Sequence, residues 1–197
     1  LGMRDTHFHD DPVHVVKNRA MSYMPSPDAG DEGVNGYIQS YQGNFALPGA
    51  GGLYTTVEDL VRWDRNFLDN RLGGPDFMEV IHSKGVLNSG EPLDYAFAIR
   101  EDEHSGLRTL GHGGSFMGFK AHYVRFPDQQ LSIWVMCNMG EIVPEDFALR
   151  VADSCAVAEG STVVCCGTVA GPVEGTTGSA PGTGTSPAHS GQVTLFP

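Results

Sequence analysis

Residues 111–138, GHGGSFMGFKAHYVRFPDQQLSIWVMCN, contain the pattern that decides the fold. Within this stretch, residues 118–126 and 131–138 have the composition of two β-strands. The tight turn PDQQ (127–130) joins them, and its proline supplies a φ of about −65°. The second strand is apolar on both of its alternating faces, which predicts a central strand that is covered on both sides. The stretch therefore predicts an antiparallel hairpin inside a larger sheet.

Two more strands are expected at residues 95–100 and 106–112, and helices are expected to flank the sheet. The sequence TVED (56–59) is close to a capping box, because it has a hydroxyl at the start and an acid three residues on. The expected helices run from this cap to about residue 69, from 75 to 83, and onward from 144. The last helix should bury Phe147, Val151 and Cys155. The fold class is thus α+β, an antiparallel sheet with flanking helices.

Bulk composition excludes several classes of partner. The chain has 197 residues and a formal net charge of −12, which would repel nucleic acid and anionic membranes. No apolar run is long enough to span a bilayer. The first residues, LGMRD, contain neither an initiator Met nor a signal-peptide pattern, so we expect the chain to be part of a longer protein. Cell location is not readable from the sequence, and a periplasmic or secreted full-length protein stays open.

The composition changes at about residue 159. Residues 167–190 are dominated by Gly, Thr, Ser, Pro and Ala, which cannot bury enough apolar surface to offset the entropy of ordering the chain. We therefore expect one folded domain over residues 1–158 and a low-complexity, disordered tail over 159–197. Two origins for this tail stay open, a linker and out-of-frame translation.

The N-terminal sequence THFHDD (6–11) offers two imidazoles and two carboxylates. In a strand or loop, His7 and His9 would share a face and hold a metal, whereas a surface turn explains the same residues without one. The four cysteines contain no C-x-x-C pair, which argues against a zinc cage. The surface turn is the preferred interpretation, and we expect neither a metal nor a cofactor.

Glycines mark two further candidates. The loop 44–54, NFALPGAGGLY, leads into the capped helix and could bind an anion there, but its spacing matches neither a P-loop nor a dinucleotide fingerprint. His112, Gly113, Gly114 and Ser115 lie at the end of a predicted strand. Glycines at such a place often mark a site where a ligand approaches the main chain.

Taken in order, LGMRDTHF, GGLYTTVEDLVRW, residues 111–138 and the final helix resemble the serine β-lactamase-like family. That family groups class C β-lactamases, D-stereospecific aminopeptidases and related esterases. The resemblance covers residues 1–158 and implies part of a β-lactamase/transpeptidase-like fold. It also implies a serine hydrolase that forms an acyl-enzyme from small acyl substrates, namely esters, D-amino-acid amides or peptides, or β-lactams.

Three motifs meet in the cleft of this family: S-x-x-K, Y-x-N, and K-T-G or H-x-G on an edge strand. Only the third is found here, as His112-Gly113-Gly114. No Ser is followed by Lys three residues on, and no Tyr by Asn two residues on. In the family both of these motifs precede the LGM block. The resemblance therefore implies that a missing N-terminal part of the same domain supplies the nucleophile, and that this chain alone is inactive.

The resemblance also implies roles for the residues that are present. Gly113 and Gly114 would let a substrate lie against the main chain, and the N–H of Ser115 would be one oxyanion donor. Gly51 and Tyr54 would line the wall of the cleft. Histidine at position 112 favours esters or D-amino-acid amides over carboxylate-bearing β-lactams, because imidazole is mostly neutral where lysine is a cation. A non-catalytic binding or regulatory module with the same sheet is the alternative.

Overall fold

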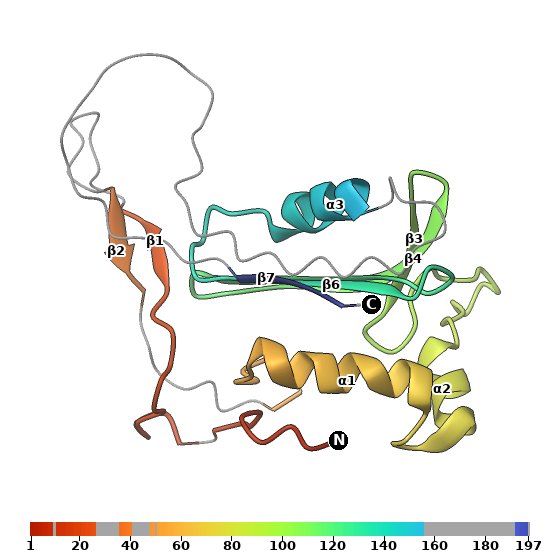
Figure 1. Cartoon of the computed structure of the whole chain (residues 1–197), viewed down its shortest axis with the longest axis horizontal. Coiled ribbons are helices and arrows are strands. Elements are labelled where there is room, and N and C mark those ends of the chain that lie inside the picture. Colours follow the sequence, from red (N-terminus) through yellow and green to blue (C-terminus); the bar gives the residue numbers. More distant parts are fainter. Residues whose placement is uncertain (10, 27–35, 41–47, 50, 156–191, 197) are drawn as a thin grey trace, which may run out of the picture.

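The computed structural model describes residues 1–9, 11–26, 36–40, 48–49, 51–155 and 192–196. Its main sheet has five antiparallel strands in the order β3-β4-β5-β6-β7 (Figure 1). These strands are β3 (Arg100–His104), β4 (Leu107–Phe116), β5 (Phe119–Phe126), β6 (Leu131–Cys137) and β7 (Gln192–Phe196). A separate pair consists of β1 (Tyr23–Pro25) and β2 (Tyr37–Gln39). The helices are α1 (Val57–Asp69), α2 (Gly74–His82) and α3 (Pro144–Cys155). The predicted α+β fold is confirmed.

The turns of the two central hairpins have specific local causes, and the one at residues 127–130 was predicted. Met117 and Gly118 join β4 to β5 with φ values of 47° and 79°, as a two-residue hairpin turn requires. The turn 127–130 joins β5 to β6, and the N–H of Gln130 donates to the carbonyl of Pro127 over 3.3 Å. These turns fix the register of the three strands that carry most of the core.

The core lies between α3 and one face of the sheet. Its buried side chains are Val124, Phe126, Ile133, Val135, Cys137, Ala148, Ala152 and Cys155. The prediction for the helix was partly wrong, because Phe147 and Val151 are only partly buried, and two alanines lie at the centre of the contact. Small side chains at the centre let the helix backbone approach the strands closely, so the larger residues pack at the margin.

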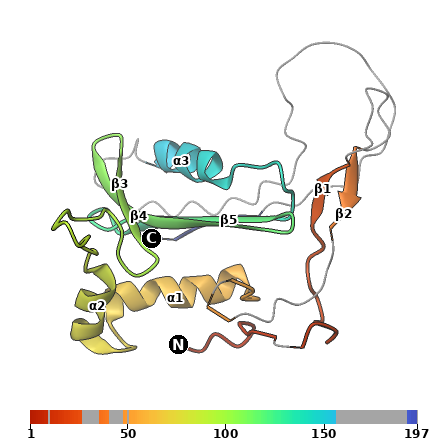
Figure 2. The same cartoon turned by 180° about the vertical axis from the view of Figure 1, so that it is seen from behind.

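Helix α1 covers the opposite face of the sheet, as both views show (Figures 1 and 2). The hydroxyl of Tyr123 donates to Asp64 of α1 over 2.9 Å, and the guanidinium of Arg125 lies 4.9 Å from the ring centroid of Phe67. Burial, followed by the nearby Asp64, raises the pKa of Tyr123 well above its ordinary value. The ring of Tyr123 also stacks on Trp134 of β6 with centroids 4.0 Å apart. Strand β6 is therefore covered on both faces, as predicted.

Two strand predictions need correction. Residues 95–100 are not a strand: Tyr95 and Arg100 form an isolated bridge around a tight turn in which Ala98 has a φ of 54°. Strand β4 continues to Phe116, beyond the predicted end at residue 112. Glycines weaken a strand interior, which predicts an early end of this strand, but the main-chain ladder to β5 needs no side chains and passes through the glycines.

Within the tail predicted for residues 159–197, the structure describes a strand over residues 192–196. Strand β7 pairs with β6 from Met136↔Gln192 to Ser132↔Phe196. The physical reason is the free edge that β6 would otherwise present, since its main-chain groups there need partners. The low-complexity residues 167–190 lie outside the described residues, and the domain boundary at 158 stays a prediction. In the described part of the chain, no helix is long and apolar enough to cross a bilayer.

Candidate active site

The candidate site is the part of β4 that extends past the end of β3. Strand β3 pairs with β4 only as far as Gly111, which lies opposite Arg100. On the other side, β5 pairs with β4 all the way to Phe116. Among the described residues, no strand therefore covers the outer edge of residues 112–116.

The register shows which main-chain groups this edge presents. In a two-residue hairpin the residues that flank the turn form a hydrogen-bonded pair, here Phe116 and Phe119, and bonded and non-bonded pairs then alternate. Gly114 is thus bonded to β5, whereas Gly113 and Ser115 direct their N–H and C=O groups away from it. The edge offers two sets of donors and acceptors to a ligand.

The glycines of the motif differ in their surroundings. A Cβ at Gly114 would have no heavy atom within 4 Å, so the space beside it is open. A Cβ at Gly113 would lie 3.5 Å from Nδ1 of His122, which is an ordinary contact. His112, Gly113, Gly114 and Ser115 are all exposed. Among the described residues, this strip of β4 is therefore accessible from outside.

His112 projects from the same face of the sheet as its cross-strand partner Tyr123, which is the face that α1 covers. Its Nε2 atom lies 2.9 Å from the hydroxyl of Tyr95. His122 lies on the opposite face, toward α3. Burial lowers the pKa of His122 below its ordinary value, Glu145 opposes this shift, and His112 adds to it. The imidazoles of positions 112 and 122 are therefore separated by the sheet and have different environments.

Gly51 and Tyr54 lie in the loop before α1. Gly51 has a φ of 135°, a conformation that favours glycine. Tyr54 pairs with His7 through two main-chain hydrogen bonds of 2.9 Å, its ring stacks on that of His7, and Arg19 lies 5.3 Å from its centroid. These contacts join Tyr54 to the N-terminal segment. That Gly51 and Tyr54 line one cleft together with the β4 edge stays a prediction.

His14 lies close to the two N-terminal histidines, His7 and His9. The ring centroids of His7 and His9 are 4.6 Å apart, and those of His9 and His14 are 4.8 Å apart. In the described ranges, no group of three or more His, Cys, Asp or Glu side chains is arranged to hold a metal ion. His14 was not singled out from the sequence, because no metal-ligand spacing includes it.

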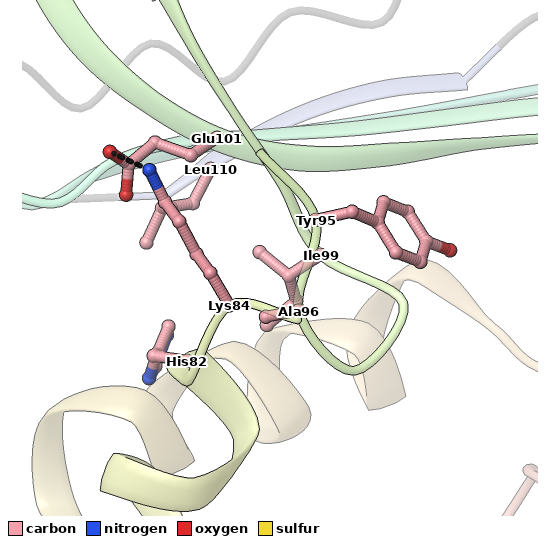
Figure 3. A pocket seen from close by; sticks show the side chains of 7 residues that line it. All are labelled: His82, Lys84, Tyr95, Ala96, Ile99, Glu101 and Leu110. Carbon is pink, nitrogen blue, oxygen red and sulfur yellow. Dashed lines mark hydrogen bonds and ion pairs between the residues drawn. The ribbon is translucent and has the colours of Figure 1, made fainter. Parts of the chain in front are cut away.

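A small hollow lies behind the loop that carries Tyr95 (Figure 3). Its lining residues are His82, Lys84, Tyr95, Ala96, Ile99, Glu101 and Leu110. No motif in the sequence connects Tyr95 with His112, because the two residues are 17 positions apart.

Comparison with known proteins identifies the family of this chain. The family model Beta-lactamase matches residues 1–157. The chain belongs to the beta-lactamase family. As a member of that family, it has an antiparallel sheet with helices on both faces that corresponds to part of the family fold.

The beta-lactamase-family chain is also similar to curated D-aminopeptidases. It is 27% identical over 117 residues to the D-aminopeptidase of Gluconobacter oxydans, a match that covers 58% of this chain and 22% of that protein. It is 26% identical over 106 residues to the D-aminopeptidase of Brucella ovis, covering 54% of this chain and 20% of the relative. The chain thus spans about a fifth of the length of these relatives.

Proposed function

We propose that this chain provides the substrate-binding edge strand of a serine hydrolase that works through an acyl-enzyme. The observation that carries the proposal is the edge of β4 beside His112, which pairs with no strand of the described residues and at which the register directs the main-chain groups of Gly113 and Ser115 outward. An extended acyl substrate can pair with such an edge as an additional strand. Open space beside Gly114 admits the substrate.

The N–H of Ser115 has the properties of an oxyanion donor. It is a main-chain group on a strand that is held by β5, so it is oriented before the substrate arrives. A fixed N–H aimed at a carbonyl oxygen stabilises the negative charge that develops when a nucleophile attacks. The side-chain hydroxyl of Ser115 has no part in this role.

The substrate class follows from the side chain at position 112 and from the relatives. Unlike a lysine side chain, an imidazole is not a permanent cation for a substrate carboxylate. The similar proteins carry the name D-aminopeptidase. Amides and peptides of D-amino acids are therefore the proposed substrates, ahead of simple esters and β-lactams.

The nucleophile is proposed to lie outside these 197 residues, because the sequence contains no Ser-x-x-Lys. The chain by itself should bind an acyl probe without turning it over. We expect no covalent labelling by a fluorophosphonate. Labelling that disappears in Ser115→Ala would contradict the assignment of Ser115 as a main-chain donor.

The binding role is tested with D-alanine amide as the probe, by titration of amide resonances in the 197-residue chain. We expect shifts at residues 113–116. Ser115→Pro removes the N–H and should weaken binding about fivefold, the effect of one lost hydrogen bond. Ser115→Ala keeps the N–H and should bind as the parent chain does. Shifts confined to other parts of the chain, or equal affinity for both variants, would exclude the β4 edge as the site.

A further inference from the structure

We propose that Tyr95 is a positioning residue for His112, an inference that rests on the proposed function of the β4 edge. The Tyr95 hydroxyl lies 2.9 Å from Nε2 of His112, and the ring centroids are 5.7 Å apart with an interplanar angle of 58°. Both side chains are exposed. An exposed imidazole without a partner turns about two side-chain torsions, whereas this hydrogen bond selects one orientation.

The main chain around Tyr95 is held in place on both sides. The N–H of Gly85 donates to the carbonyl of Tyr95 over 2.9 Å, and the N–H of Leu93 donates to the carbonyl of Gly85 over 2.8 Å. Tyr95 also forms a bridge with Arg100, the first residue of β3. The phenol therefore projects from a backbone that is fixed by pairing in two directions.

Lys84 adds a second constraint on the same loop. Its Nζ atom lies 3.2 Å from Asp94, which precedes Tyr95, and 3.0 Å from Glu101 of β3. Hydrogen bonds from Arg108 and Lys84 hold the pKa of Glu101 below its ordinary value. Figure 3 shows the Lys84–Glu101 pair on one side of the loop, with the Tyr95 ring pointing away from it. The ion pairs thus anchor the loop without competing for the phenol.

The contact leaves one ring nitrogen for the substrate. Nε2 of His112 is engaged by Tyr95, and within the described residues Nδ1 forms no hydrogen bond. A phenol hydroxyl is uncharged at neutral pH and both donates and accepts. Tyr95 can therefore fix the imidazole without adding a charge at the edge, which suits the proposed amide substrates.

Tyr95→Phe tests this inference, because it removes the hydroxyl and keeps the ring. In long-range ¹H–¹⁵N spectra of the 197-residue chain, we expect the Nε2 resonance of His112 to move. Binding of D-alanine amide should weaken about two- to tenfold, as expected for one hydrogen bond. Lys84→Met, which releases the loop but keeps the hydroxyl, should move the same resonance in the same direction by less.

Tyr37→Phe is the matched control, since it removes a hydroxyl that donates to Glu141 over 2.7 Å, and it should leave His112 unchanged. An Nε2 resonance of His112 that is the same in Tyr95→Phe as in the parent chain overturns the positioning role, whether or not D-alanine amide binds. If the resonance moves while the parent chain fails to bind D-alanine amide, the positioning role stands and the proposed function is wrong.

Discussion

Two glycines of the motif at residues 111–114 serve different purposes. A Cβ at Gly111 would overlap the carbonyl oxygen of Tyr123 on the neighbouring strand, so glycine is required there for the sheet to close. A Cβ at Gly114 would meet nothing within 4 Å, so the space over that face of β4 is open. Packing among the described residues therefore requires glycine at position 111 but not at position 114.

This difference predicts that an alanine substitution destabilises the fold at position 111 and has little effect on stability at position 114. Gly111→Ala should lower the free energy of unfolding by about 1–3 kcal/mol, because a main-chain carbonyl has to move. Gly114→Ala should change it by no more than about 0.5 kcal/mol, as is usual for an exposed position. Urea denaturation of both variants measures the two values. A loss in Gly114→Ala as large as that in Gly111→Ala would show that the space beside Gly114 is filled.

At the level of single residues, the sequence identified only part of the candidate site. His112 and its glycines were found because the motif is local. The sequence pattern predicts a strand at Tyr95 and does not indicate the contact of this residue with His112. That contact depends on how the loop before β3 folds back onto β4, which is set by Gly85, Lys84 and the turn at Ala98 and not by a spacing in the sequence.

At the level of elements, α1 is defined by signals that the sequence contains. The side chain of Thr56 accepts the N–H of Asp59 over 3.3 Å, and Asn70 ends the helix with a φ of 49°. Strand ends are less well encoded. The ladder between β4 and β5 continues through glycines that have little strand propensity, because the turn at Met117 sets its register.

Asp59 also ties the N-terminal segment to α1. Its buried carboxylate accepts from the N–H of Asp5 and the hydroxyl of Thr6, each over 2.8 Å, and from Arg62 over 2.6 Å. Burial raises its pKa, but the hydrogen bonds from Thr6 and Asp5 and the ion pair with Arg62 outweigh this, so the pKa lies below its ordinary value. The ionised form is therefore the one that holds the segment.

A carboxyl with a lowered pKa stabilises the fold above the unfolded-state pKa of about 4, and this contribution is lost as the pH falls through the folded-state pKa. The free energy of unfolding of the parent chain should fall as the pH drops below about 4. Compared with the parent chain, Asp59→Asn should have a lower free energy of unfolding at pH 6, and this free energy should fall less on acidification. Urea midpoints at pH 6 and pH 3 measure both. The control, Asp69→Asn at the exposed end of α1, should keep the acid dependence of the parent. An equal change in urea midpoint between pH 6 and pH 3 for Asp59→Asn and the parent chain would contradict the role of this carboxylate.

At the level of the whole molecule, helices cover both faces of one sheet, and β7 covers one of its edges. The two covered faces were predictable, because residues 131–137 are apolar on both sides. The covered edge was not, since β7 follows a long segment of low complexity and is only five residues long. Such a strand is defined by its partner: β6 offers a row of main-chain groups that any extended segment can pair with.

A chain that ends at residue 191 tests whether β7 protects this edge. Without the pairs from Met136↔Gln192 to Ser132↔Phe196, main-chain amides on the outer side of β6 lose their partners. Hydrogen–deuterium exchange should become faster in peptides that cover β6 and stay the same in the β4–β5 hairpin. The open edge should also promote concentration-dependent association, because two such edges can pair with each other. A chain that lacks only Pro197 is the matched control and should behave like the parent. Unchanged exchange in β6 after removal of β7 would mean that this strand does not protect the sheet in solution.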